Sequence, residues 1–548
     1  MVARTHERLA RYGASAQAGG DHRLRVVGRC RGRRACLVIV GLALLVAGCG
    51  ASGSTPTQSP QRGSPASAGS ATASSPTLTI TPSTGLVGGQ ELQVRLAGFP
   101  QRATVMVYQC AGAPKVGGLH GCGGAASSYL YTGGAGSASG VFTAQSAAGT
   151  GPNGTRTPCR QQCVLVGRVI KLGAGPPPNP VPMATAPLSF SDTAMPGLAY
   201  SWLVDLSWVS ATDGWALAAR PCISGTCARL AHTTDGGVHW QALPNPPARL
   251  QDGTVDCAKV ACVSGVRFAS PTVGYLYGPA LLMTSDGGRT WRAQPGLQVE
   301  TLTIAGSQVY RVAYDHGGCP GPCLPTLQRA AIGSSAWRPL IGQLAYPGRS
   351  GAAQIVASGS TLLLAMFGSQ AGPVSAQAVV YRSADSGAAW QQRTDPCSGR
   401  GAGGKSAEED LTDLAGAPGG FFAGLCSPHT GSGAFVVTSS DGGESWQTAG
   451  ALPSVQALAL LAAASPTTLA VSTGAAGGSG VFTARLLVTT DAGRHWTAAA
   501  TETQQILQAG VPAWLGFETS QIGRWISAPH SVWSTKDGGL HWTRTRFP

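Results

Sequence analysis

The stretch Thr233-Thr234-Asp235-Gly236-Gly237-Val238-His239-Trp240 returns in variant form five more times before the chain ends at residue 548. Its constant pattern is Ser or Thr, any residue, Asp, any residue, Gly, two further residues and Trp. A short pattern that recurs at nearly equal intervals is the sequence signature of a propeller, a solenoid or another array. This motif therefore decides the expected fold of the C-terminal part of the chain.

The six copies define a set of paired Asp and Trp positions. These are Asp235 and Trp240, Asp286 and Trp291, Asp385 and Trp390, Asp441 and Trp446, Asp491 and Trp496, and Asp537 and Trp542. A seventh, incomplete copy, Ile332-Gly333-Ser334-Ser335-Ala336-Trp337, ends at Trp337 and has no Asp. The seven Trp residues lie 46 to 56 residues apart, which suits units of four strands each. We therefore expect a seven-bladed β-propeller over residues 199–548.

The residue types of the motif have a structural explanation. An Asp in a tight turn accepts hydrogen bonds from backbone N–H groups a few residues on, the Gly takes a positive φ, and the Trp buries its ring against neighbouring strands. We expect this structural use rather than direct chemistry. His239, His495 and His541 fill the same slot in separate units, so they are not expected to share a metal ion.

The motif resembles the Asp-box, or BNR, repeat of sialidases and of the photosystem II assembly-factor propellers, and it is called the Asp box below. The resemblance implies that the boxes lie at blade turns away from a catalytic face. Sialidases also need three Arg, a Tyr/Glu pair and an Asp acid, and their Arg-Ile-Pro motif is absent from this chain. A sialidase-type glycoside hydrolase is therefore kept as the alternative to a non-enzymatic binding protein.

The N-terminus has the pattern of an export signal. Nine Arg against Glu7 and Asp21 precede an uncharged apolar run over residues 37–47, which is too short for a typical membrane span. The run ends in Val46-Ala47-Gly48-Cys49, which resembles the bacterial lipobox. We expect residues 1–48 to be a lipoprotein signal peptide and Cys49 to carry the lipid. The alternative is an uncleaved anchor or a plain secretory signal.

Composition supports this localisation and excludes one class of partner. Residues 49–76 are mostly Ser, Ala, Thr, Pro and Gly, which predicts a disordered tether. The signal holds a surplus of seven positive charges out of the formal +14, and the rest is spread without a Lys/Arg run, so nucleic acid binding is not expected. Because Arg far outnumbers Lys and Gly reaches 78 residues, we expect a high-GC Gram-positive bacterium and the extracytoplasmic side of its cell membrane.

The cysteines agree with an oxidising compartment. Twelve of the 15 remain after Cys30, Cys36 and Cys49 are set aside. The expected disulfides are Cys110–Cys122, Cys159–Cys163, Cys222–Cys227, Cys257–Cys262, Cys319–Cys323 and Cys397–Cys426. Zinc binding is the alternative, but the pairs belong to different repeats, so we expect no metal site.

Residues 77–191 show the alternation of half-buried strands in Leu78-Thr79-Ile80-Thr81 and in 92–96. The order of landmarks resembles the neocarzinostatin family of immunoglobulin-like sandwiches that carry enediyne antibiotics. It comprises residues 81–86, Gly98-Phe99, Tyr108-Gln109-Cys110-Ala111, 163–167 and Pro187-Leu188-Ser189-Phe190. The carriers place a cleft aromatic after the Gln-Cys-Ala run, where this chain has Gly112. A small apolar ligand in this sandwich is therefore only a second alternative function.

The sequence thus predicts an all-β protein in which an immunoglobulin-like sandwich precedes a seven-bladed propeller. We expect a non-enzymatic, lipid-anchored binding or scaffold protein with no cofactor. Propeller faces present many short loops on a rigid ring, which suits binding of a protein or a glycan. Neither G-x-S-x-G nor H-E-x-x-H occurs in the chain. The partner itself is not readable from one sequence.

Overall fold

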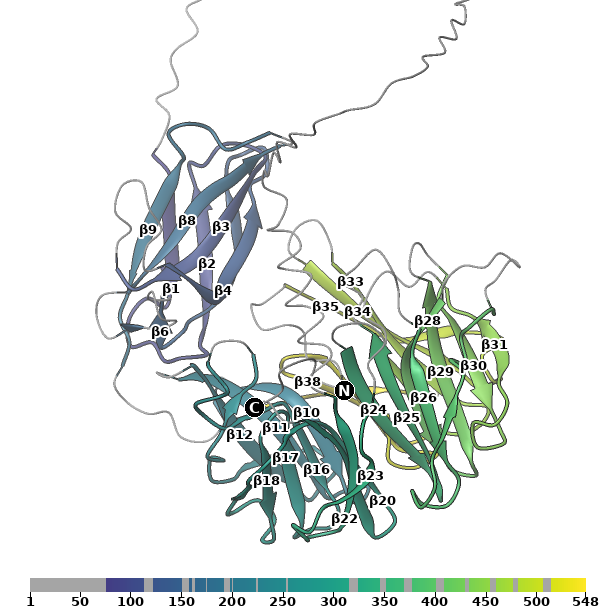
Figure 1. Ribbon diagram of the computed structural model, residues 1–548. Coiled ribbons are helices and arrows are strands. Elements are labelled where there is room, and N and C mark those ends of the chain that lie inside the picture. The colour runs from purple at the N-terminus through teal and green to yellow at the C-terminus, as the bar shows by residue number, and fades with distance from the viewer. Residues whose placement is uncertain are drawn as a thin grey trace, which may run out of the picture. The chain divides into compact units, whose positions relative to one another are not determined.

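The computed structural model (Figure 1) describes the chain from residue 75 onward with internal gaps. The described residues are 75–112, 122–149, 157–159, 163–173, 175–191, 198–199, 201–222, 225–252, 255–314, 324–344, 351–368, 377–400, 409–428, 433–453, 460–476, 481–505 and 514–548. Every regular element in these ranges is a β-strand, so the described protein is all-β. The expected signal peptide, nearly all of the tether, Cys49 and the Cys319/Cys323 pair lie outside them. No helix within these ranges has the length and apolar character needed to cross a membrane.

The N-terminal strands form two sheets and a short ribbon. The first sheet has the order β1 (Thr77–Thr81), β2 (Glu91–Ala97), β5 (Ala138–Thr143). The second has the order β4 (Cys122–Tyr131), β3 (Ala103–Cys110), β8 (Cys163–Leu172), β9 (Met183–Leu188). The ribbon joins β6 (Ala147–Ala148) to β7 (Thr157–Pro158).

These two sheets pack face to face because their strands alternate. In β2 the residues Leu92, Val94 and Leu96 are buried while their neighbours are exposed. They meet Phe142 of β5 and residues of the second sheet such as Val105 in one apolar cluster. Burying one face of each sheet is what makes a two-layer arrangement stable.

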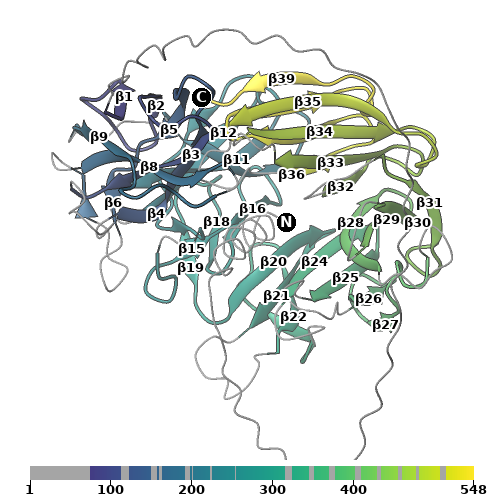
Figure 2. The same cartoon turned by 90° about the horizontal axis from the view of Figure 1, so that it is seen from above.

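The described residues of 202–546 form seven further sheets in chain order (Figures 1 and 2). Sheet 1 contains β10 (Trp202–Trp208), β11 (Gly214–Cys222), β12 (Gly225–Thr233), β13 (Gln241–Ala242), β14 (Arg249–Leu250) and β15 (Cys262–Val263). Sheet 2 contains β16 (Gly265–Phe268), β17 (Gly274–Tyr277), β18 (Leu281–Thr284) and β19 (Arg292–Gln294). Sheet 3 contains β20 (Gln298–Ala305), β21 (Gln308–Tyr314), β22 (Thr326–Ala331) and β23 (Arg338–Ile341).

Sheets 4 to 7 repeat the same four-stranded antiparallel order. Sheet 4 contains β24 (Gly351–Ser358), β25 (Thr361–Gly368), β26 (Val379–Ser383) and β27 (Gln391–Arg393). Sheet 5 contains β28 (Glu409–Ala417), β29 (Phe421–Pro428), β30 (Phe435–Ser439) and β31 (Gln447–Ala451). Sheet 6 contains β32 (Leu460–Ala463), β33 (Leu469–Ala476), β34 (Val481–Thr489) and β35 (Thr497–Gln505). Sheet 7 contains β36 (Trp514–Phe517), β37 (Gly523–Ala528), β38 (Ser531–Thr535) and β39 (Thr543–Arg546).

Each sheet packs against the next through its own apolar cluster. Trp215 of sheet 1 meets Phe268 of sheet 2 with ring centroids 3.8 Å apart, and equivalent clusters join every later pair of neighbours. One more cluster joins sheet 7 to sheet 1, with Ile526 and Phe547 packed against Leu203 and Ala216. Every sheet therefore buries both faces, as a continuous core requires.

The six Asp boxes form the turns between the third and fourth strands of their sheets. In sheet 5 the Oδ1 atom of Asp441 accepts hydrogen bonds from the Ser439 hydroxyl at 2.7 Å and from the N–H groups of Glu444 and Ser445 at 3.0 Å each. The Ser445 hydroxyl donates to Oδ2 at 2.5 Å. The Gly443 N–H in turn donates to the Ser439 hydroxyl at 2.8 Å. The Ser/Thr, Asp and Gly of the motif thus hold one another in place.

The two residues that follow each box Asp both have a positive φ. Gly442 and Gly443 do so at 75° and 82°, whereas Ser386 and Ala492 occupy the first of these positions in their boxes at 56° and 62°. The box Trp rings are half-buried, which is less burial than the sequence predicts. The reason is their place beside an exposed turn, where one side of the ring remains open to solvent.

A second repeated contact lies on the first strand of four sheets. A polar side chain there accepts a hydrogen bond from a backbone N–H of the first strand of the following sheet. Asp205 accepts from Val266, Glu300 from Ala353 and Asp413 from Leu461, at 2.9, 2.6 and 2.9 Å. Gln354 both donates to the Leu414 carbonyl and accepts from its N–H. The alternation of the strands alone did not reveal these contacts.

Arg524 of sheet 7 makes the polar contact with sheet 1. Its guanidinium lies 3.9 Å from the ring centroid of Trp208 and donates to the carbonyls of Gly236 and Ala211. Glu518 Oε2 lies 3.8 Å from Arg524 Nε, and neither oxygen of Glu518 accepts a hydrogen bond within the described part of the chain. Burial raises the pKa of Glu518 to about 7, although the charge of Arg524 opposes this shift.

Replacement of Asp441 by Ala tests the box turn. We expect the free energy of unfolding to fall by about 1 to 3 kcal/mol, since several hydrogen bonds to one carboxylate are lost together. Urea denaturation monitored by Trp fluorescence measures the change. The control is Ser440→Ala in the same turn, at an exposed position, which should change stability by less than about 0.5 kcal/mol. Equal effects of the two substitutions would contradict this role of the box carboxylate.

Glu518→Gln tests the buried carboxyl. Because the folded pKa lies above the ordinary value of 4.5, the protonated form is favoured by folding, and stability is lost as pH rises from about 4.5 through 7. The Gln variant should lack this loss. Between pH 5 and pH 8 the free energy of unfolding of the wild type should therefore fall by about 2 to 3 kcal/mol more than that of the variant. Urea denaturation of both proteins at the two pH values measures it, and parallel pH profiles would refute the expectation.

Candidate functional site

The structure assigns the Asp-box carboxylates to their turns. Hydrogen bonds from the Thr290 hydroxyl, the Thr290 N–H and the Thr284 hydroxyl lower the pKa of Asp286 to about 2. In the box of Asp235 the donors include the ring Nδ1 of His239 at 2.6 Å, and His495 and His541 make the same contact in theirs. Each of these carboxylates already accepts several hydrogen bonds within its own turn, so they are poorly placed to bind a ligand.

An open groove lies between the outer strands of sheet 4 and the Asp box of sheet 5. Its volume is about 980 Å³. The lining combines side-chain amides and hydroxyls, charged groups and one indole. The residues are Gln377, Ala378, Val379, Gln392, Arg393, Thr394, Asp395, Pro396, Ser398, Arg400, Glu444, Ser445 and Trp446.

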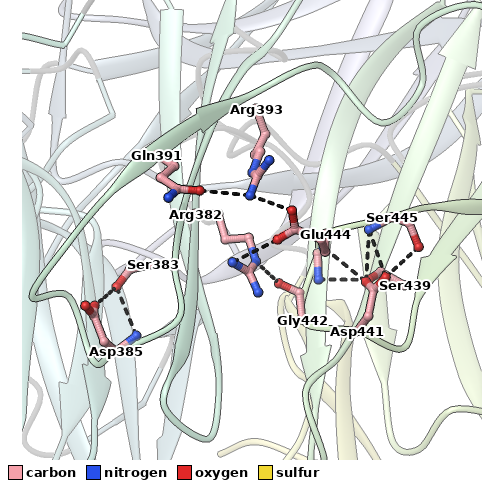
Figure 3. Close-up of polar contacts among 11 residues, drawn as sticks. Arg382, Ser383, Asp385, Gln391, Arg393, Ser439, Asp441, Gly442, Glu444 and Ser445 are labelled. Atoms are coloured by element: carbon pink, nitrogen blue, oxygen red, sulfur yellow. Dashed lines mark hydrogen bonds and ion pairs between the residues drawn. The ribbon is translucent and has the colours of Figure 1, made fainter.

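Glu444 joins the two walls of this groove, as Figure 3 shows. Its Oε1 atom accepts a hydrogen bond from Arg393 NH2 at 2.7 Å, and Oε2 lies 3.1 Å from Arg382 NH1. Arg382 Nε also donates to the Gly442 carbonyl at 2.6 Å, and Arg393 NH2 donates to Gln391 Oε1 at 2.9 Å. Two arginines of sheet 4 therefore hold the Asp-box turn of sheet 5, and the Glu444 carboxylate is neutralised by them.

Asp395 shapes the loop that follows β27. Its Oδ1 accepts from the Cys397 N–H at 2.8 Å and its Oδ2 from the Ala378 N–H at 3.0 Å. Burial raises the pKa of Asp395, and these backbone hydrogen bonds offset only part of the shift. The disulfide between Cys397 and Cys426 ties the same loop to β29 of sheet 5. The groove is thus bounded by a loop with a fixed conformation.

Arg400 at the end of this loop is the exposed cation of the groove. It makes no ion pair with any residue that the structure describes. A guanidinium presents five N–H donors in a planar fork that suits carboxylate and hydroxyl acceptors. Arg400 can therefore contact a ligand without first breaking an ion pair of the described residues.

The second sheet of the sandwich carries exposed apolar side chains on its outer face. Tyr129, Met106, Arg168 and Met183 are cross-strand partners in register across β4, β3, β8 and β9. Tyr129 is 49% exposed, Tyr131 48% and Met183 40%. Exposed apolar groups gathered on one sheet face are a feature of binding surfaces.

The sequence predicted part of these surroundings. Disulfides join Cys110 to Cys122, Cys159 to Cys163, Cys222 to Cys227, Cys257 to Cys262 and Cys397 to Cys426, as the spacing indicated. The groove was missed, because Arg393 and Glu444 are 51 residues apart and neither belongs to a recognisable motif. Within the described ranges no cluster of His, Cys, Asp and Glu could hold a metal ion.

Comparison with known proteins gives two kinds of likeness. Residues 78–190 match the sequence model of the neocarzinostatin family. The structure of macromomycin is 23% identical over 21% of this chain and 100% of its own, with a TM-score of 0.17. No curated protein matches the chain.

Other solved structures match a larger share of the chain. YCF48 bound to D1 peptide is 16% identical over 62% of this chain and 93% of its own, with a TM-score of 0.37. The sialidase of Trypanosoma rangeli is 11% identical over 45% of this chain and 48% of its own, with a TM-score of 0.32. The chain is thus similar both to a propeller enzyme and to a propeller protein bound to a peptide.

Proposed function

We propose that sheets 1 to 7 are the blades of a closed seven-bladed β-propeller and that residues 77–191 form an immunoglobulin-like sandwich. Seven interfaces between seven sheets support the ring, since the cluster with Ile526 and Phe547 joins the last sheet to the first. The Leu203 N–H also donates to the Pro529 carbonyl across the same interface at 2.8 Å. The face-to-face packing of two sheets supports the sandwich.

On this scaffold we propose a non-enzymatic binding protein whose groove between sheets 4 and 5 takes a glycan. The observation that carries the proposal is the lining of that groove. Gln377, Gln392 and Ser398 supply amide and hydroxyl groups, Arg400 an exposed cation and Trp446 an apolar surface. Hydroxyl-rich ligands are recognised by this combination of planar hydrogen-bonding groups and an aromatic ring.

The carboxylates of the groove argue against glycoside hydrolysis there. That reaction uses one protonated acid and one carboxylate that is free to act as nucleophile or base. Glu444 has an arginine at each oxygen, and both oxygens of Asp395 accept backbone N–H groups. Burial raises the pKa of Asp395, as a general acid requires. Its hydrogen bonds to backbone N–H groups, however, assign this carboxylate to holding its loop in place.

The sandwich supports a second candidate function, the carriage of a small apolar ligand. The exposed Tyr129, Tyr131 and Met183 on one sheet face favour it. Gly112 opposes it, because the related antibiotic carriers have an aromatic at that position of their cleft. Retention of an apolar fluorescent dye by the chain, lost in a Tyr129→Ala/Tyr131→Ala variant, would favour this candidate over the groove.

Hydrolysis and binding assays on the mature chain test the groove. We expect no turnover of a fluorogenic sialoside, and we expect Arg400→Ala to weaken binding to glycans on an array about tenfold through the loss of charge-assisted hydrogen bonds. Arg494→Ala is the matched control, because Arg494 is exposed on the box turn of sheet 6, outside the groove. Turnover of the sialoside that is abolished by Asp395→Asn would show that the groove is catalytic and would overturn the proposal of a binding protein. Binding of a peptide that depends on Arg400 would show that the ligand is a protein and not a glycan.

We also propose that the protein is held at the extracytoplasmic side of the membrane by lipid on Cys49. The support is the lipobox-like sequence 46–49 after an apolar run. Cys49→Ala should move the protein from the membrane to the soluble fraction, since two acyl chains partition strongly into a bilayer. Fractionation followed by immunoblotting measures this. Membrane retention of the Ala variant would show that another segment is the anchor.

A further inference from the structure

The acidic side chains that line the groove between sheets 4 and 5 are already engaged. Each oxygen of Glu444 faces an arginine, and each oxygen of Asp395 accepts a hydrogen bond from a backbone N–H. The Ser445 hydroxyl donates to Asp441 Oδ2 at 2.5 Å, so it is committed to its own turn. A ligand that offers mainly hydrogen-bond donors would therefore compete with contacts that hold the walls of the groove.

Two guanidinium groups of the same groove still have donors to offer. Arg400 is exposed and makes no ion pair with a described residue. The contacts of Arg393 with described side chains all use NH2, which bonds to Gln391 and Glu444, so NH1 has no partner among them. Both arginines line the groove. Their unused N–H groups are therefore the charged donors that a ligand meets there.

Trp446 adds a neutral donor. In sheets 2, 4 and 7 the indole Nε1–H of the box Trp donates to the carbonyl of a box Gly in its own turn, at 3.1, 3.2 and 3.0 Å. Trp446 makes no such bond within the described ranges, although its half-buried ring lines the groove. Its N–H is thus left for a ligand, beside the apolar surface of the ring.

The backbone that carries Arg400 has a fixed conformation. The Arg400 N–H donates to the Cys397 carbonyl at 3.3 Å, and the Ser398 N–H donates to the Asp395 carbonyl at 3.1 Å. The disulfide to Cys426 ties the same loop to sheet 5. A loop that is already ordered loses less conformational entropy when a ligand binds.

We propose that this groove binds an acidic sugar chain, with the carboxylate or sulfate group of one sugar unit held by Arg400 and Arg393. A sugar hydroxyl both donates and accepts, whereas these anionic groups only accept, so a lining with unused donors and engaged carboxylates favours the anionic group. Bonds between a guanidinium and such an anion are also roughly twice as strong as neutral ones. The open volume of about 980 Å³ suits an oligosaccharide. This inference rests on the proposed glycan function and adds the class of glycan.

Four oligosaccharides of equal length test the inference by isothermal titration calorimetry on the mature chain. They are an alginate, which carries carboxylates, a carrageenan, which carries sulfates, and the carboxyl-reduced and desulfated forms of the two. At least one acidic chain should bind about tenfold or more tightly than its neutral form. This preference should shrink as NaCl rises from about 20 mM to about 500 mM, because salt screens exposed charges. The acidic chain that binds identifies the group as carboxylate or sulfate.

Substitutions of Arg400 locate the contact. Arg400→Gln keeps a planar hydrogen-bonding group and removes the charge, so it should weaken binding of the acidic chain about tenfold and of its neutral form less than about twofold. Arg400→Lys keeps the charge without the fork and should be intermediate. Arg494→Gln, at an exposed position outside the groove, is the matched control and should bind as the wild type does.

The outcomes separate this inference from the proposed function on which it rests. Equal affinity for the acidic and neutral forms, or an equal loss of both in Arg400→Gln, would overturn the acidic ligand and leave a groove for neutral glycans. Binding of none of the four sugars would also overturn it. A glycan array on which the chain binds nothing would overturn the proposed function as well.

Discussion

Six of the seven sheets share one carboxylate-centred turn, and the packing of the sheets depends on it. The Asp of each box gathers the hydroxyl two residues before it and N–H groups three or four residues after it, and this fixes the carbonyl of the next residue in one direction. The preceding sheet donates to that carbonyl, from Trp215 to Gly287 at 3.0 Å, from Tyr310 to Ser386 at 2.6 Å and from Arg382 to Gly442 at 2.6 Å. Arg524 does the same for Gly236 between sheet 7 and sheet 1. A local motif thus makes a contact between sheets, which explains why it recurs in six of the seven sheets.

The first strands of the sheets also form hydrogen bonds to the neighbouring sheet, and they do so through buried polar side chains. Asp205 and Asp413 are almost completely buried, and burying a carboxylate costs several kcal/mol unless donors surround it. Each has one oxygen bonded to an N–H of its own strand and the other bonded to an N–H of the next sheet. The apolar clusters supply most of the burial but are not directional, so these hydrogen bonds help to fix how far each sheet is offset from its neighbour.

The contacts that the sequence predicted join residues close together in the chain, whereas the contacts that it missed join residues far apart. The box contacts span two to four residues and the Cys222–Cys227 disulfide spans five, so spacing was sufficient to predict them. The groove needs Arg393 and Glu444, which approach only after sheets 4 and 5 pack together. Half-burial of the box Trp rings likewise depends on the surface around the turn and not on the motif.

The distribution of engaged charges limits what the protein can bind. The carboxylates of the boxes and of the groove already accept hydrogen bonds from backbone, hydroxyl or arginine donors, so a cationic ligand would have to displace contacts that hold turns and loops together. Arg400 has no carboxylate partner among the described residues, and it stands on a loop tied by the Cys397–Cys426 disulfide. Binding an anionic or hydroxyl-rich ligand at such positions leaves the turns intact. Because the Asp side chains are engaged in holding turns and loops, Arg is the charged side chain that remains available for recognition of a ligand.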